Sequence, residues 1–167
     1  MEMHMNGYIT ASLTVIIVIL LLITMTFAAS DTATTTASVN VNEFLSVTLS
    51  NAPVSFPNMD PGTTENATVG NGFPLTVTIG AESNVNANIT TEANSANFAG
   101  PGTLAVSNMK WSDSETGLFT EYTTTNATVC SGVSPGSNCD IYHKLSVPGG
   151  TTAGTYTVDI TVTAISV

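Results

Sequence analysis

Basic residues are almost absent from this chain of 167 residues. Lys110 and Lys144 are the only two, against twelve Asp and Glu, and the formal net charge is −10. Proteins that bind nucleic acids neutralise phosphates with Lys and Arg, so this composition argues strongly against a nucleic-acid partner. It argues equally against attachment to an anionic lipid surface through basic residues.

Several catalytic signatures are also missing. The sequence holds no His-Glu-x-x-His motif and no glycine-rich phosphate loop. His143 is the only histidine beyond the N-terminal segment, and its place in an alternating stretch predicts a half-buried structural side chain. We therefore expect a protein that is not an enzyme and that needs no cofactor.

A long apolar run is present near the N-terminus, from Val15 to Ile23, inside a segment from Tyr8 to Ala29. As a secretory signal peptide, this segment would be cleaved after Ala28 or Ser30. As a retained helix, residues 8–29 could span a bilayer and anchor the chain in the membrane. Small residues before a sharp drop in hydrophobicity favour cleavage of residues 1–30. Both alternatives predict that the remainder is extracellular or on the cell surface.

Residues 31–42 form the next segment. Asp31 to Ser38 are short polar residues without a large apolar anchor, and Val39 and Val41 then alternate with Asn. Such a segment suits either a flexible leader or an extended arm that pairs with a strand elsewhere. Val39 and Val41 are our candidate residues for a donated strand.

Residues 43–167 show the two-residue period of half-buried strands, with Gly, Pro and Asn between the runs. Alternation is clearest at Leu45–Leu49, Leu75–Ile79, Val85–Ile89, Ile141–Val147 and Thr155–Ala164. This predicts one all-β domain, an immunoglobulin-like or jelly-roll-like sandwich of about seven to nine antiparallel strands, preceded by the N-terminal hydrophobic helix. Its expected bulky core residues are Phe44, Phe56, Phe73, Trp111, Tyr142 and Tyr156.

The last of these runs, Thr155–Ala164, is the most regular. Tyr156, Val158, Ile160, Val162 and Ala164 fall on one side of an extended chain. We expect this strand to be central to the core, with Ile160 as a core residue that has neighbours in both sheets.

The two cysteines, Cys130 and Cys139, bracket a loop rich in Ser, Gly and Pro. In an exported chain such a pair predicts a disulfide. The spacing does not suit a zinc site or a Cys-x-x-Cys redox motif.

Two kinds of surface site are suggested by short motifs. Asn66, Asn88 and Asn126 each begin an Asn-x-Thr glycosylation triplet. Carboxylates in turns could bind calcium, and the candidates are Asp113 with Glu115, and Asp60 near Glu65. No complete calcium-loop motif is present, and acidic turn residues are usually only solvated.

Several short stretches resemble a recurring pattern in exported archaeal β-sandwich proteins. They are Leu45–Asn51, Val54–Phe56, Met59–Thr63, Ser83–Asn86, Val106–Met109 with Trp111, and Val147–Tyr156. The pattern is similar to the wider group that contains the bacterial biofilm-fibre protein TasA, camelysin, and archaeal bundling-pilus and thread subunits. The resemblance implies a filament subunit in which an N-terminal strand of one copy fills a gap in the next.

Three functions remain open at this point. The chain could be an extracellular filament subunit that polymerises with copies of itself through residues 31–42. It could be a pilin-like subunit that retains its N-terminal helix. It could also be a monomeric surface domain that binds calcium or carbohydrate.

Overall fold

The structure is a computed structural model that describes residues 35–167. The hydrophobic segment of residues 1–30 and residues 31–34 of the expected arm lie outside the described residues. Both the N-terminal helix and its cleavage therefore stay predictions. Residues 35–46 contain no strand or helix, and regular structure begins at Val47.

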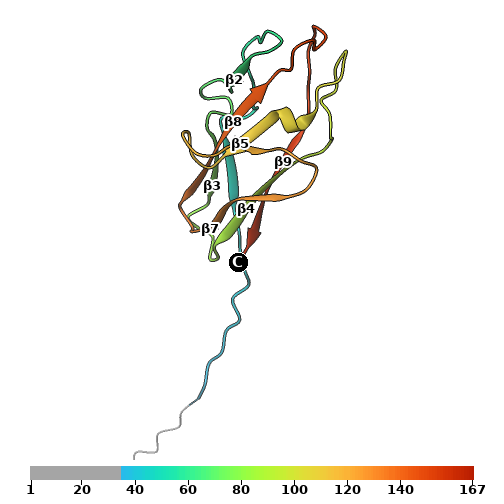
Figure 1. Cartoon of the computed structure of the whole chain (residues 1–167). Coiled ribbons are helices and arrows are strands. Elements are labelled where there is room, and N and C mark those ends of the chain that lie inside the picture. Colours follow the sequence, from blue (N-terminus) through green and yellow to red (C-terminus); the bar gives the residue numbers. More distant parts are fainter. Residues whose placement is uncertain (1–34) are drawn as a thin grey trace, which may run out of the picture. The chain divides into compact units, whose positions relative to one another are not determined.

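Nine strands in two antiparallel sheets make up the regular structure of residues 35–167 (Figure 1). The larger sheet has the order β1 (Val47–Ser50), β3 (Leu75–Ile79), β8 (Asn138–Ser146), β5 (Met109–Ser112) and β6 (Thr120–Glu121), with β2 (Thr64–Asn66) also paired to β8. The smaller sheet has the order β7 (Ala127–Val133), β4 (Ala87–Ala93) and β9 (Ile160–Ser166). The prediction of an all-β, two-sheet antiparallel domain is confirmed.

The only helical element of the described part is the short 3₁₀ turn Val106–Asn108. Residues 35–167 thus contain no helix with the length and apolar character needed to cross a membrane.

Strand β3 shows how the alternating sequence builds the sandwich. Leu75, Val77 and Ile79 point inward and are fully buried. Thr76 and Thr78 point outward, where their hydroxyls donate hydrogen bonds to the side chains of Asp140 and Asn138 on β8, at 2.7 and 2.8 Å. The same alternation runs along β8, so the core lies between the two sheets.

The six aromatic residues expected in the core differ in their burial. Phe73 and Trp111 are buried, and the half-buried ones are Phe56, Tyr142 and Tyr156. The expectation for Phe44 is wrong, because its side chain is 53% exposed. The strand expected around Phe44 begins only at Val47, so no ladder turns this side chain toward the core.

The C-terminal strand is shorter and more exposed than the sequence predicts. β9 begins at Ile160 rather than at Thr155. The predicted alternation is present, since Ile160, Val162 and Ala164 pack against the core from one face. These side chains are only half-buried, however, so Ile160 packs against the margin of the core and does not lie in its middle. The cause is topological, because β9 pairs with β4 alone among the strands of residues 35–167 and is an edge strand there.

The disulfide connects the two sheets. Cys130 lies on β7 of the smaller sheet and Cys139 on β8 of the larger sheet, with their Cα atoms 6.1 Å apart. Cys139 belongs to the buried core, and Cys130 packs against it. The predicted disulfide is confirmed, but it joins the two layers as well as closing a loop.

Replacing both cysteines with Ser should therefore loosen the contact between the sheets as well as the loop of residues 131–138. For a loop of this length, the chain-entropy model gives a loss of about 2–3 kcal/mol in the free energy of unfolding. Urea denaturation of the oxidised protein and of the double Ser variant would measure this difference. Equal midpoints would contradict a stabilising role for the disulfide.

Candidate functional site

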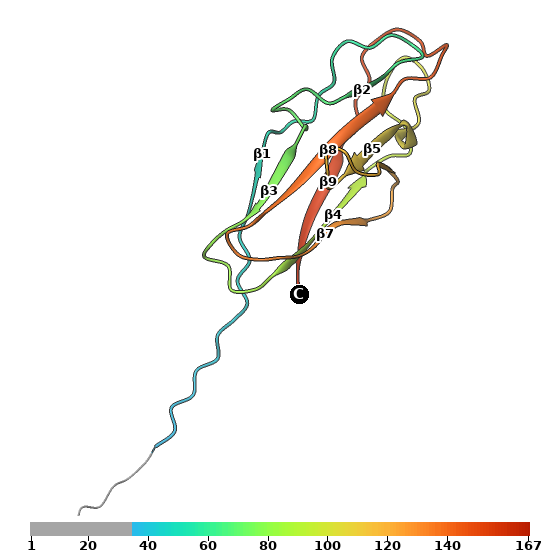
Figure 2. The same ribbon diagram turned by 60° about the vertical axis from the view of Figure 1, so that its left-hand side comes forward.

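Strand β1 lies at the outer edge of the larger sheet (Figure 2), and its inward face is partly uncovered. In the register with β3, Val47 lies opposite Ile79 and Leu49 lies opposite Val77. Directly opposed residues point to the same face of a sheet, so both β1 side chains point into the sandwich. Ile79 and Val77 are 0% and 1% exposed, whereas Val47 and Leu49 are 43% and 49% exposed. Two apolar side chains of the inner face are therefore left half uncovered.

Strand β9 shows the same feature on the smaller sheet. Val162 lies opposite Thr91 and Ala164 lies opposite Ile89, and both β4 partners are buried. Val162 and Ala164 share that face but are only half-buried. No other strand of residues 35–167 pairs with the outer side of β9. An edge strand of this kind presents unpaired backbone N–H and C=O groups, which can template a further strand.

The edge strands β1 and β9 are linked at one end of the domain. Ser166, the last residue of β9, donates a hydrogen bond from Oγ to the carboxylate of Glu43, just before β1, at 3.2 Å. At the same end, the Val167 N–H donates to the carbonyl of Asn86, just before β4, at 3.0 Å. We call the incompletely covered inward side chains of these two strands the open edge. It consists of Val47, Leu49, Ile160, Val162 and Ala164.

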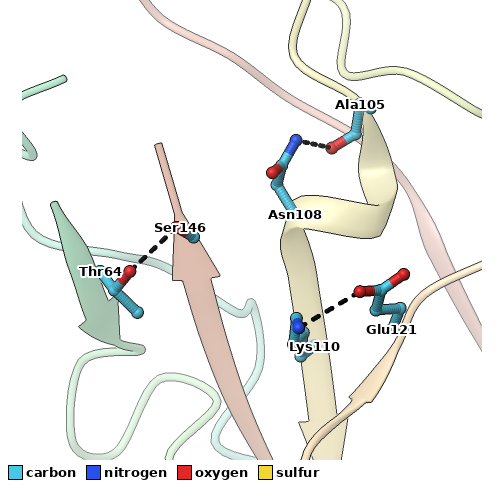
Figure 3. Close-up of polar contacts among 6 residues, drawn as sticks. All are labelled: Thr64, Ala105, Asn108, Lys110, Glu121 and Ser146. Atoms are coloured by element: carbon cyan, nitrogen blue, oxygen red, sulfur yellow. Dashed lines mark hydrogen bonds and ion pairs between the residues drawn. The ribbon is translucent and has the colours of Figure 1, made fainter. Parts of the chain in front are cut away.

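The outer face of the larger sheet is different, because its polar groups pair with one another (Figure 3). Lys110 Nζ lies 3.2 Å from the carboxylate of Glu121, and the Thr64 hydroxyl donates to Ser146 at 2.9 Å. Lys144, the cross-strand neighbour of Lys110, lies over the ring of Phe119 at 4.3 Å. Exposed ion pairs contribute little stability. This face has the character of a solvated surface, and the open edge does not.

The donor-strand candidates are also exposed. Val39 and Val41 are 87% and 72% exposed and belong to no strand.

A buried polar network joins the sheets beneath the surface. The sequence predicted a half-buried His143, but its side chain is 0% exposed. Its Nδ1 lies 2.8 Å from the Gly72 carbonyl oxygen. A carbonyl can only accept, so Nδ1 carries the proton and Nε2 accepts from the Tyr122 hydroxyl at 2.9 Å. Thr91 of β4 lies 3.3 Å from the same hydroxyl. Burial lowers the pKa of His143 to about 4 and raises the pKa of Tyr122.

The three glycosylation triplets lie in different surroundings. Asn66 on β2 and Asn126 just before β7 are exposed. Asn88 lies on β4, the central strand of the smaller sheet, where its side-chain oxygen accepts from the Gly132 N–H at 2.9 Å. Accessibility thus favours Asn66 and Asn126 over Asn88 as acceptors.

The calcium candidates are exposed residues of separate segments. Asp60 lies in the loop before β2, and Glu65 lies on β2 itself. Asp113 and Glu115 lie in the turn after β5. Within residues 35–167, no three residues of the types His, Cys, Asp and Glu gather as a metal site would require.

A shallow pocket of about 360 Å³ lies where β9 begins. It is lined by Asn94, Ser95, Asn97, Phe98, Ala99, Thr157, Val158 and Asp159. Two of its polar side chains already bond to each other, because Asn94 Nδ2 donates to Asp159 at 3.0 Å.

Gly132–Gly136 matches the Gly-x-Ser-x-Gly motif of α/β-hydrolases. In those enzymes the serine occupies a sharp turn between a strand and a helix. Here Ser134 lies in the connection from β7 to β8, both of them strands. The only described histidine is the buried His143, whose two ring nitrogens are occupied by Tyr122 and Gly72.

Comparison with protein-family models, curated proteins and solved structures gave no match. Sequence patterns gave Val39 and Val41 as candidate donor residues and predicted the inward faces of both edge strands. They could not show that these faces lack a neighbour among residues 35–167, since that depends on strand order.

Proposed function

We propose that this chain is a structural subunit of an extracellular filament, in which the arm of one copy adds a strand to the open edge of the next. The observation that carries this proposal is the half-exposure of inward apolar side chains on both edge strands. An added strand would pair with the free backbone groups of β9 and cover Val47 and Leu49. Copies of the same chain are the partners.

The arm has a suitable pattern for this role. In an extended segment, Ala37, Val39 and Val41 point to one side, and Ser38 and Asn40 point to the other. The apolar side would face the open edge and the polar side would face solvent. Each apolar side chain that becomes fully buried contributes about 1.5–3 kcal/mol.

Strand direction supports an open-ended assembly. The arm leaves the domain before Val47, at the end where Ser166 and Glu43 meet. A donated strand antiparallel to β9 brings the donor's domain to the opposite end of the acceptor, near Ile160, and this contact repeats head to tail. A parallel strand would bring like ends together and close a dimer. Antiparallel pairing is also slightly more stable per residue, which favours the filament.

The finer fold that we propose is immunoglobulin-like, and residues 35–167 supply no strand at the place of its last strand. β1, β3, β8 and β5 follow the order of strands A, B, E and D, while β4 and β9 follow C and F. The place of strand G is beside β9, on the open edge. Tyr156 supports the assignment, because its hydroxyl donates to the Thr152 carbonyl at 2.8 Å, as in the tyrosine corner before strand F.

The compartment and the resemblance agree with this function. A disulfide between Cys130 and Cys139 suits an oxidising environment outside the cell. The exposed Asn66 and Asn126 could carry glycans there. We also propose that the chain belongs to the group that contains TasA and camelysin. A role in adhesion or biofilm is part of the same proposal.

A second candidate function is carbohydrate binding by a monomeric surface domain. It is favoured by the pocket at the start of β9, which is lined by Asn94, Asn97 and Asp159. The oligomeric state of the purified protein distinguishes the two functions, since a carbohydrate-binding domain of this kind would remain monomeric.

Replacing Val39 with Lys tests the filament proposal, because it puts a charge on the apolar side of the arm. Loss of a buried Val corresponds to at least about a tenfold loss of assembly. Asn40→Lys adds the same charge on the polar side and should assemble like the unmodified chain. Sedimentation and electron microscopy would measure the polymer. Equal assembly of both variants would contradict the proposed pairing.

A further inference from the structure

The side chain of Asn84 bonds to the base of the arm at two points. Its Oδ1 accepts from the Phe44 N–H at 2.7 Å, and its Nδ2 donates to the Asn42 carbonyl at 2.9 Å. The Asn84 backbone N–H donates to the Phe44 carbonyl at 3.1 Å. Asn84 therefore binds the chain on both sides of Glu43 with three hydrogen bonds.

The same loop holds the chain further along. Gly80 donates its N–H to the Ser46 carbonyl at 2.9 Å, and the Ser46 N–H donates to Ser83 Oγ at 2.9 Å. Residues 41–46 show no turn or bend. We call the contacts of residues 80–84 with residues 42–46 the arm clamp.

The arm clamp occupies the segment in which the arm would have to reverse to reach its own domain. β1 supplies Val47 and Leu49 of the open edge and begins at Val47. An arm that folded back onto its own open edge would need a hairpin between the arm and β1, within residues 42–46. A hairpin turn there would break the paired contacts of Asn84 with Asn42 and Phe44.

Without the clamp, pairing of the arm with its own domain would be favoured by the high effective concentration of a tethered segment. A segment tethered through a short linker meets its own domain at an effective concentration in the millimolar range. Separate subunits at lower concentration would lose that competition, and each chain would cover its own open edge. An assembly based on strand exchange therefore needs a feature that opposes self-pairing.

We propose that the arm clamp, through Asn84, prevents the arm from covering its own open edge and so reserves that edge for the arm of a second copy. This inference rests on the proposed function and adds the reason why exchange occurs between chains. Asn84 acts as a positioning residue, because it fixes the direction of the chain at the base of the arm.

The test uses the full chain with one added cysteine in the arm, Val39→Cys, and one in the open edge, Val162→Cys. The two native cysteines are joined to each other, so the added pair supplies the free thiols. Mild oxidation followed by a denaturing, non-reducing gel separates the products. A ladder reports disulfides between chains, and a fast monomer band reports a disulfide within one chain.

With Asn84 present, we expect the ladder. Asn84→Ala should weaken the ladder at least tenfold and replace it with the fast monomer band. Asn84→Asp keeps an acceptor for the Phe44 N–H but loses the donor to Asn42, so it should give both products. Asn84 is exposed, and the core should fold in both variants. Asn86→Ala is the matched control, since this exposed residue of the same loop bonds to Val167 through its backbone carbonyl.

Three results would contradict the account in distinguishable ways. An unchanged ladder in Asn84→Ala, equal to that of Asn86→Ala, would overturn the role of the clamp but leave strand exchange intact. A dominant monomer band with Asn84 present would show that the arm folds back despite the clamp. Neither product in any background would overturn strand donation at this edge, and the proposed function with it.

Discussion

A chain that lacks residues 31–42 is expected to remain folded, to stay monomeric and to form no filaments at all. The described part of this segment contributes no strand, and both of its valines are exposed. Its removal leaves the two sheets and the disulfide in place. Circular dichroism and thermal melting would show the fold, and electron microscopy would show the loss of polymer.

The matched control for this deletion is a synthetic peptide of residues 35–42 added to the shortened chain. The peptide should raise the melting temperature, because it binds the folded state with its open edge and has no site on the unfolded chain. A peptide with Lys in place of Val39 should raise it less. Filaments formed by the shortened chain would show that assembly uses another surface.

The stability of the domain should fall by about 3 kcal/mol as the pH is lowered from 6.5 to 4, because of His143. Burial lowers the pKa of His143 to about 4 in the folded protein, whereas an unfolded histidine has a pKa of about 6.5. Between these values the unfolded chain binds the proton and the folded chain does not. The contribution is thus complete above pH 6.5 and is lost progressively below it.

His143→Gln removes the titrating group and serves as the control. Its unfolding free energy should be lower at pH 7, since the Tyr122 and Gly72 contacts are altered, but should vary less between pH 6.5 and 4. If this variant does not fold, the NMR titration of the His143 ring in the unmodified chain gives the same information. A ring that titrates near pH 6.5 would contradict the buried neutral network.

Local sequence patterns predicted the parts of the fold that depend on alternation. The strand Leu75–Ile79 was predicted at its observed bounds, and the inward faces of β8 and β9 were predicted correctly. The disulfide followed from two cysteines in an exported chain. In each case the prediction needs only a few consecutive residues, or the inference that the chain is exported.

The remaining features depend on which strands become neighbours. The alternation of β9 is that of a core strand. Its burial, however, depends on its neighbours in the sheet, which are β4 on one side and no described strand on the other. His143 looked half-buried because its partners Tyr122 and Gly72 are 21 and 71 residues away in the sequence. Phe44 was misplaced because the alternation around it does not become a strand.

Electron cryomicroscopy of the assembled protein tests strand exchange most directly, because it shows what lies beside β9. The account predicts an extended strand from a second copy, antiparallel to β9, with Val39 and Val41 facing Val47, Leu49 and Val162. Subunits that meet through other surfaces, with the outer side of β9 open to solvent or paired with the arm of its own chain, would contradict it.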